Sequence, residues 1–276
     1  MKADLHIHSH YSDGTFSIEE IMLAARQKGL NIISITDHEN TGGVESARQI
    51  GTFYGIEIIP GVELCTFFDK EEIHLLAYYK SIDNDCLQDK LKVLRKEREK
   101  TTWAMYQKLK QNGIKLKWEK IEQESGAKGV IYKGHILRAI WNSVSRPDEL
   151  DWKQIISWFR PGGIAYVPFE VNSFTDTVDF VLDTGGLPVL AHPGLIRNQK
   201  LIPDLLTYKP IGLEVYYGYW ENQQELISFY EKLSRGKAIL LTGVSDFHGS
   251  FSPVDLGGVF VPDTCVAKIK EYLLID

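Results

Sequence analysis

The stretch Ala3–His8, which reads Ala-Asp-Leu-His-Ile-His, decides how the rest of the sequence is interpreted. It is a short strand-like run in which apolar and polar residues alternate. His6 and His8 stand two residues apart, so on a strand both side chains point to the same side and could hold one ion. The spacing alone is weak evidence, because a single histidine is more often an ordinary core or surface residue.

Other short, β-branched runs recur along the chain with helical patterns between them. The predicted strands are Ala3–His8, Asn31–Asp37, Glu57–Glu63, Glu72–Tyr79, Leu187–His192, Gly212–Tyr217 and Ala238–Ser245. Alternation of strands and helices predicts an α/β fold with a parallel sheet.

Three helices outside the middle of the chain have clear boundaries. Ser17 and Glu20 have the spacing of a capping box, and Gly29 is the expected stop of the first helix. A second helix is predicted from about Val44 to Tyr54, and a terminal helix from about Val266 to Leu274.

The middle of the chain lacks this alternation of strands and helices. Residues 84–124 form a long charged helical pattern, which predicts an inserted helical subdomain at 81–159. Residues 90–120 carry eleven Lys and Arg against three Glu, a charge of +8 that leaves −14 elsewhere in a chain of net charge −6. The aromatics Trp103, Tyr106 and Trp118 in this segment could form a nucleic-acid surface. We favour a solvated helix whose aromatics pack on the main body and whose charge attracts small anions.

The composition sets outer limits on the kind of protein. The chain has 276 residues, 43% of them hydrophobic and 25% charged, which excludes a disordered chain. Its three cysteines form no C-x-x-C pair, so neither a disulfide framework nor a thiolate zinc ribbon is expected, and a reducing cytoplasm fits best. No uncharged run approaches the ~18–20 residues that span a bilayer, so no membrane association is expected.

Most of the histidines fall at equivalent places in this pattern. Six of the eight lie in or at the carboxyl ends of predicted strands, and three acids join them: His6, His8, His38, His74, His192, His248, Asp13, Glu63 and Asp246. In a parallel α/β barrel these ends converge on one face. Without cations such a cluster would leave buried charge unpaired, at a cost on the order of several kcal/mol per charge. Divalent metal ions are the expected solution.

The composition of this ligand set points to a reaction. Nitrogen and oxygen ligands suit Mn²⁺, which we expect first, or Fe²⁺ or Zn²⁺, and nine groups are enough for two or three ions. Three divalent ions beside three carboxylates leave a positive site that attracts a phosphate dianion. Ions about 3.5–4 Å apart can lower the pKa of a bridging water to near 7 and clamp the attacking and leaving oxygens. We therefore hypothesise hydrolysis of a phosphate ester by a metal-bridging hydroxide.

Several motifs occur together in a characteristic order. They are His6-Ile7-His8-Ser9, Tyr11-Ser12-Asp13-Gly14, Thr36-Asp37-His38, Gly61-Val62-Glu63, Ala191-His192-Pro193-Gly194 and Ser245-Asp246-Phe247-His248-Gly249. This combination resembles the polymerase and histidinol phosphatase (PHP) superfamily, and within it the stand-alone phosphoesterases that include 3′,5′-nucleoside bisphosphate phosphatases. The resemblance implies a distorted seven-stranded (β/α)7 TIM-like barrel formed by residues 1–80 and 160–276. The insertion at 81–159 would cap its active site.

The resemblance also implies how the ligands divide among three ions. One ion would be bound by His6, His8, Glu63 and Asp246. Glu63 would bridge to a second ion, shared with His74 and His192. The third would be bound by Asp13, His38 and His248. Asp37 could orient a ligand imidazole or cap the following segment.

Substrate contacts are expected from the insertion. Gly134–Arg138 resembles the family's His-x-x-Arg element, whose two side chains share a helix face. Arg138 would anchor phosphate oxygens, His135 would contact the substrate or donate a proton, and Asp246 completes the predicted catalytic set. On the residues alone, His135 and Arg138 are an ordinary surface pair. Arg197, five residues after His192, is a second candidate anchor.

Two departures from the family pattern bear on the substrate. Tyr132-Lys133-Gly134 stands where relatives commonly carry a Gly-Arg-Pro-like lead-in, and Phe169 stands where a histidine is expected. The best-fitting substrate is a 3′,5′-nucleoside bisphosphate, with short single-stranded RNA as a related candidate. The alternatives are a cyclic sugar phosphate, histidinol phosphate, or a non-catalytic metal-binding accessory module of a polymerase. The oligomeric state is left open.

Overall fold

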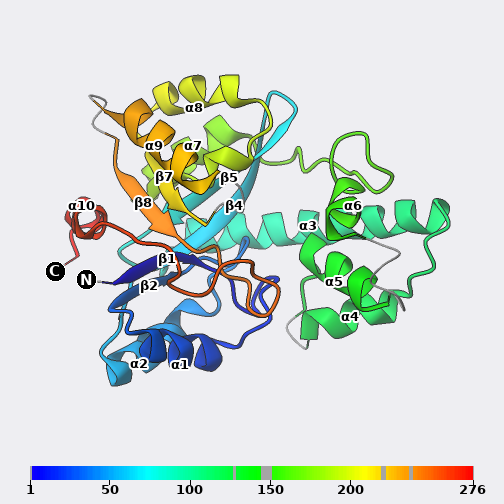
Figure 1. Ribbon diagram of the computed structural model, residues 1–276, viewed down its shortest axis with the longest axis horizontal. Helices are drawn as coiled ribbons and strands as arrows, with labels where there is room; N and C mark the ends of the chain where they lie inside the picture. The colour runs from blue at the N-terminus through cyan, green and yellow to red at the C-terminus, as the bar shows by residue number, and fades with distance from the viewer. Residues whose placement is uncertain (1, 127–128, 144–150, 219–221, 236–238, 276) are drawn as a thin grey trace.

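The computed structural model describes residues 2–126, 129–143, 151–218, 222–235 and 239–275 (Figure 1). Its strands form two sheets. The first is parallel and has the order β1 (Ala3–Ile7), β2 (Ile32–Ile35) and β3 (Glu57–Ile58). The second contains, in order, β4 (Gly61–Phe68), β5 (Glu71–Tyr78), β6 (Leu187–Leu190), β7 (Gly212–Tyr217) and β8 (Leu241–Val244). All seven predicted strand regions contain strand, although Ala238 lies outside the described residues.

The two sheets are joined at their ends by single parallel bridges. Ile7, at the end of β1, bridges to Phe247 beyond β8, and His38 beyond β2 bridges to Glu63 on β4. These bridges bring four segments that carry predicted ligands next to one another. The predicted α/β class is confirmed, and the seven-stranded barrel stays a prediction in its details.

The prediction of a wholly parallel sheet was wrong at β5. This strand runs antiparallel to both β4 and β6, whereas β6, β7 and β8 are parallel. β4 continues through Phe68, and Asp69 and Lys70 adopt left-handed φ values of 44° and 65°. A two-residue turn of this kind can connect only antiparallel strands, and no helix separates β4 from β5.

Helices cover the sheets on their outer sides. In Figure 1, α1 (Ile18–Lys28) and α2 (Val44–Tyr54) lie beside the three-stranded sheet. The five-stranded sheet is covered by α7 (Phe174–Asp183), α8 (Ile202–Tyr208) and α9 (Gln223–Ser234), and α10 (Asp263–Leu273) closes the chain. Short 3₁₀ turns, η3 (Pro193–Leu195) and η4 (Gln199–Leu201), follow β6.

The predicted boundaries of the first two helices are confirmed, and capping residues mark them. Ser17 accepts a hydrogen bond from Glu20 N at 3.2 Å while the Glu20 carboxylate accepts one from Ser17 N at 2.7 Å, which is the predicted capping box. Gly29 ends α1 with a left-handed φ of 70°. The second helix has the predicted bounds, and the terminal helix begins three residues earlier than predicted, at Asp263.

The described residues of the inserted segment include four α-helices, of which the long α3 starts beside the sheets and runs outward to the other three at one end of the molecule (Figure 1). They are α3 (Asp85–Gln111), α4 (Trp118–Ser125), α5 (Lys133–Ser143) and α6 (Trp152–Ser157). A hydrophobic cluster separate from those around the sheets joins them, with Leu109, Ile121 and Ile136 among its members. The domain boundaries at 80 and 160 stay a prediction.

The aromatics of α3 and α4 pack differently from our expectation. The rings of Trp103, Tyr106 and Trp118 contact one another, with centroid distances of 4.7–5.4 Å, and do so within the insertion instead of against the main body. Trp103 is 46% exposed. Across the described residues, no helix has the length and hydrophobicity needed to cross a membrane.

Candidate metal centre

Glu63 on β4 lies at the centre of the predicted ligands. Its Oε1 is 2.8 Å from His74 Nδ1 and 3.0 Å from His192 Nε2. Its Oε2 is 3.1–3.2 Å from nitrogens of three further histidines, His6, His8 and His38. The carboxylate is 1% exposed, so five imidazoles from four segments of the chain surround one buried acid. The structure therefore brings the predicted residues together.

A first group of donors converges between β1, β4 and the end of β8. His6 Nε2 and His8 Nε2 are 3.0 Å apart. Each lies within 3.4 Å of Asp246 Oδ1 and within 3.2 Å of Glu63 Oε2. These are the four residues expected to share one ion.

A second and a third group extend from this one. His74 and His192 both contact Glu63 Oε1, which is the arrangement expected for the second ion. The third group gathers on Asp13 Oδ1, which is 3.5 Å from His248 Nε2 and 3.9 Å from His38 Nε2. His8 Nδ1 also lies 3.9 Å from this oxygen.

The donor set fits divalent cations. Metal–ligand bonds of about 2.0–2.2 Å place neighbouring ligand atoms about 3 Å apart, which is the separation found around Glu63. Within the described part of the chain, Asp13 Oδ1, His38 Nδ1 and Asp246 Oδ1 are buried and have no hydrogen-bond partner. A cation would satisfy all three atoms, so the residues fit the predicted metal ions.

The electrostatics of the pocket favour positive charge. Burial opposes protonation of His6, but Glu63, Asp246 and Glu214 outweigh it and hold the His6 pKa well above its usual value. Burial also opposes protonation of His8, yet hydrogen bonds to Asp246 and Glu63 raise its pKa to about 10. Glu63 has its pKa held well below the usual range by His6, His38 and His74, against the effect of burial. The negative charge of the carboxylates in this cluster therefore favours cations beside it, either protonated histidines or metal ions.

Several supporting groups were not predicted. Glu214 on β7 is fully buried, and its Oε1 lies 3.1 Å from His6 Nδ1 while its Oε2 accepts a hydrogen bond from His192 N at 2.6 Å. Tyr217, on the same strand, donates its hydroxyl to Asp246 Oδ2 at 2.7 Å. Such partners fix the orientation of metal ligands. An acid between apolar residues of a strand was the signal that could have identified Glu214.

Asp37 acts on a loop instead of directly on a ligand ring. Its Oδ1 accepts a hydrogen bond from Ser9 N at 2.7 Å, and its Oδ2 accepts one from Ser9 Oγ at 2.6 Å. Ser12 Oγ also donates to Asp37, and lies 3.3 Å from His8 Nδ1. Asp37 thus holds the segment between His8 and Asp13, which is a third alternative to the two readings of the sequence.

The predicted substrate residues of α5 are buried. His135 is 1% exposed, and its Nδ1 accepts a hydrogen bond from Tyr132 N at 2.9 Å. Burial and the neighbouring Arg138 lower the His135 pKa to about 4, so the ring is neutral near pH 7. Arg138 donates from Nη1 to the Asp13 carbonyl oxygen and from Nε to Glu124 at 3.4 Å. These contacts hold protein groups, and the predicted roles of His135 and Arg138 toward substrate stay untested.

Two other cations pair with neighbouring glutamates of β5, and the partner of one of them also contacts a proposed ligand. Lys133 Nζ lies 3.2 Å from Glu72 Oε1, and the same oxygen is 3.3 Å from His74 Nε2. Arg197 Nη2 lies 3.1 Å from Glu71 Oε1 and its side chain is 49% exposed. Phe169, where a histidine was expected, is 1% exposed with the Arg98 guanidinium 4.0 Å above its ring centroid. It therefore supplies no polar group to a ligand.

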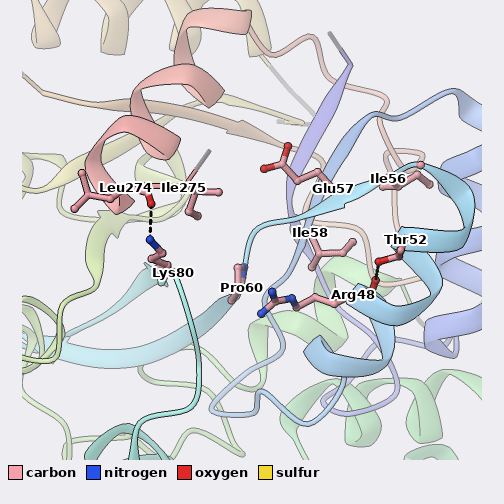
Figure 2. A pocket seen from close by; sticks show the side chains of 11 residues that line it. Arg48, Thr52, Ile56, Glu57, Ile58, Pro60, Lys80, Leu274 and Ile275 are labelled. Atoms are coloured by element: carbon pink, nitrogen blue, oxygen red, sulfur yellow. Dashed lines mark hydrogen bonds between the residues drawn. The ribbon is translucent and has the colours of Figure 1, made fainter.

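A separate hollow of about 490 Å³ contains none of these groups. Figure 2 shows its wall, where Arg48, Glu57 and Lys80 are the charged residues, and Lys80 donates to the Leu274 carbonyl oxygen at 2.7 Å. None of the described residues that line it is a histidine or another of the predicted ligands.

Comparison with known proteins agrees with this geometry. The family model for the PHP domain matches residues 4–162, and the chain belongs to this family. That finding confirms the family predicted from the motifs.

Three characterised relatives resemble the chain over most of its length. Phosphoribosyl 1,2-cyclic phosphate 1,2-diphosphodiesterase of Eggerthella lenta is 28% identical, over 95% of this chain and 100% of the relative. A 5′-3′ exoribonuclease of Haemophilus influenzae is 27% identical over 93% of each chain. The 3′,5′-nucleoside bisphosphate phosphatase of Chromobacterium violaceum is 27% identical over 78% of this chain and 76% of the relative. By these names, all three relatives hydrolyse phosphoric ester bonds.

A solved structure supports the fold. The structure of an amidohydrolase from Chromobacterium violaceum, with bound sulfate and no metal, superposes with a TM-score of 0.87 at 23% identity. The match covers 99% of this chain and 97% of the other.

Proposed function

We propose that this protein is a metal-dependent phosphoesterase that hydrolyses a phosphate ester of a small ribose phosphate. The observation that carries the proposal is the Glu63 carboxylate, which has five imidazole nitrogens within 3.2 Å of its two oxygens. Such a group can bridge cations, and the three relatives support the same class of reaction. A barrel of residues 1–80 and 160–276, capped by residues 81–159, is the architecture we propose around it.

The protein's residues would hold three cations, for which Mn²⁺ is the first candidate. Glu63 would bridge the first two positions, with His6, His8 and Asp246 at the first and His74 and His192 at the second. Asp13, His38 and His248 would hold the third. Bound divalent ions supply Lewis-acid stabilisation of the phosphate oxygens and an activated water as the nucleophile.

The side chains around this centre have distinct tasks. With metal bound, Glu214 would keep the proton of His6 on Nδ1, so that the electron pair of Nε2 faces the centre. Tyr217 orients Asp246 in the same way by donating to one of its oxygens. Lys133 and Arg197 stand beside the centre as cations that can exchange Glu72 and Glu71 for phosphate oxygens. They would orient a substrate that carries a second phosphate group.

The preferred substrate in this proposal is a cyclic phosphodiester of a ribose phosphate. The Eggerthella lenta relative, which matches along its whole length, is named for a phosphoribosyl 1,2-cyclic phosphate. Phe169 is buried beneath Arg98 and cannot replace the histidine expected for a bisphosphatase. A nucleoside 3′,5′-bisphosphate is the second candidate, favoured by the Chromobacterium violaceum relative.

Phosphorus NMR can separate these substrates. Protein loaded with Mn²⁺ is incubated with a 5-phosphoribose 1,2-cyclic phosphate, adenosine 3′,5′-bisphosphate, a short RNA and histidinol phosphate. We expect ring opening of the cyclic diester to give the highest kcat/KM, and the Glu63→Gln variant to show none. Preference for the bisphosphate would replace the substrate assignment. If metal-loaded protein hydrolyses no phosphate ester in the panel, the phosphoesterase proposal fails and the accessory-module reading is favoured.

A further inference from the structure

The nine proposed ligands are held in place by two different parts of the chain. Glu214 and Tyr217, both on β7, contact His6, His192 and Asp246. These supports belong to the same sheets that carry the ligands. Asp13 and His38, in contrast, lie on loops that are contacted by the inserted helices.

Asp13 is held by the start of α5. Arg138 donates to its carbonyl oxygen, and a backbone hydrogen bond joins the His135 ring to the adjacent Ser12. Gly134 lies so close that a Cβ at this position would overlap the Asp13 carboxylate. Contacts from Gly134, His135 and Arg138 in the first turns of α5 thus fix both the backbone and the carboxylate of Asp13.

His38 is held from both sides by the insertion. Tyr132 donates its hydroxyl to the His38 carbonyl oxygen at 2.7 Å, and the two rings stack with centroids 5.9 Å apart. On the other side, Arg98 of α3 donates two hydrogen bonds, of 2.9 and 3.2 Å, to the carboxylate of Glu39, the residue after His38. Arg95 donates to the Glu39 carbonyl oxygen at 2.7 Å.

The backbone conformation of Glu39 shows what the contact with Arg98 stabilises. Its φ of 47° lies in the left-handed region, which non-glycine residues adopt only where their surroundings enforce it. The carboxylate also accepts a hydrogen bond from Cys65 N at 3.0 Å, two residues beyond Glu63. Arg98 therefore stabilises a strained residue directly beside His38.

We propose that the inserted helices α3 and α5 assemble the third cation position, formed by Asp13, His38 and His248, whereas β7 positions ligands of the other two. This inference rests on the ligand assignment of the proposed function. Its support is that the insertion fixes the main chain of Asp13 and His38, while the buried Asp13 Oδ1, 3.9 Å from His38 Nε2, has no hydrogen-bond partner among the described residues. His248 Nε2 lies 3.5 Å from that Asp13 oxygen.

The role of the insertion in the third cation position can be tested with conservative variants in which the number of bound ions and their affinities are measured. Tyr132→Phe removes one hydroxyl from the His38 contact without burying a charge, and Arg138→Lys keeps the charge but loses the planar fork that contacts Asp13. Tyr79→Phe is the matched control, because its buried hydroxyl contacts Thr184 at 3.1 Å and no proposed ligand. Bound Mn²⁺ is measured by equilibrium dialysis with elemental analysis over a range of free metal.

We expect three sites in the wild type and in Tyr79→Phe. In Tyr132→Phe the weakest site should lose about five- to tenfold in affinity while the other two sites keep theirs. A general loss of stability would weaken all sites or none, so selective loss at one site is the signature of positioning. Three unchanged affinities in both Tyr132→Phe and Arg138→Lys would overturn the inference and leave the metal centre intact. A wild type that binds fewer than three ions would instead contradict the three-ion centre of the proposed function.

Discussion

Glu214 Oε1 lies 3.1 Å from His6 Nδ1, and the other oxygen of the same carboxylate accepts the His192 backbone N–H at 2.6 Å. One fully buried acid on β7 thereby positions a ligand of the proposed first ion and the backbone of a ligand of the second. Carboxylates in this relationship to a ligand imidazole fix its tautomer and raise its basicity.

Glu214→Gln should weaken metal binding without emptying the centre. The amide can still accept a hydrogen bond from His6, but it lacks the negative charge, so affinity for the tightest ion should fall about tenfold or more. Competition with a chromophoric chelator measures this affinity. Glu231→Gln, whose side chain accepts a bond from Tyr216 outside the centre, is the control. An unchanged affinity in Glu214→Gln would exclude Glu214 from the support of the centre.

Metal binding should release protons and become tighter as the pH rises. In the metal-free protein, neighbouring acids outweigh burial and hold the pKa of His6 well above 6.5 and that of His8 at about 10, so this pair of rings binds protons at pH 7. Metal ions compete with these protons. Calorimetric titrations in buffers of different ionisation enthalpy should show net proton release at pH 7, and its absence would contradict these ligand assignments.

The metal-free protein should lose stability between about pH 6.5 and 10. A folded pKa raised above the unfolded value of 6.5 means that protonation favours the folded state, and this contribution is complete below 6.5 and disappears as the pH passes through the folded pKa. Urea unfolding of chelator-treated protein across this range measures the effect. Stability that rises with pH would show that His6 and His8 are not protonated as described.

Lys133→Met and Arg197→Met should raise KM more than they lower kcat. Both cations contact partly buried glutamates and can anchor a second phosphate of the substrate, so their loss removes binding energy away from the reacting bond. Steady-state kinetics with the preferred ester measures each constant. Lys100→Met, which alters an exposed pair on α3, is the control. Equal kinetics in all three variants would place Lys133 and Arg197 outside the substrate site.

The metal centre could be predicted from the sequence because its residues sit at repeated positions in a periodic pattern. His6 and His8 alternate along a strand, so strand periodicity places them on one face, and the expected convergence of strand ends brings His192 to them. Glu63 joins them from near the start of β4, which continues beyond it through Phe68. His74 was predicted correctly as a neighbour of Glu63 even though β5 runs opposite to the predicted direction, because Cys65 and His74 are paired across the hairpin.

The supporting contacts could not be predicted in this way. Arg98 donates a hydrogen bond to Glu39, which lies 59 residues earlier in the sequence, and Phe169, still farther along the chain, packs against Arg98. Contacts of this kind depend on how the insertion docks, which no local pattern encodes. For the same reason, the contacts of the Arg138 guanidinium with Asp13 and Glu124 could not be predicted, and its role as a substrate anchor stays a prediction.

Anomalous diffraction from Mn²⁺-loaded crystals tests the central claim most directly. We expect three anomalous peaks around Glu63, with its two carboxylate oxygens bound to different ions and Asp13 beside the third. Peaks elsewhere in the molecule, or none at Glu63 in protein shown to contain manganese, would contradict it.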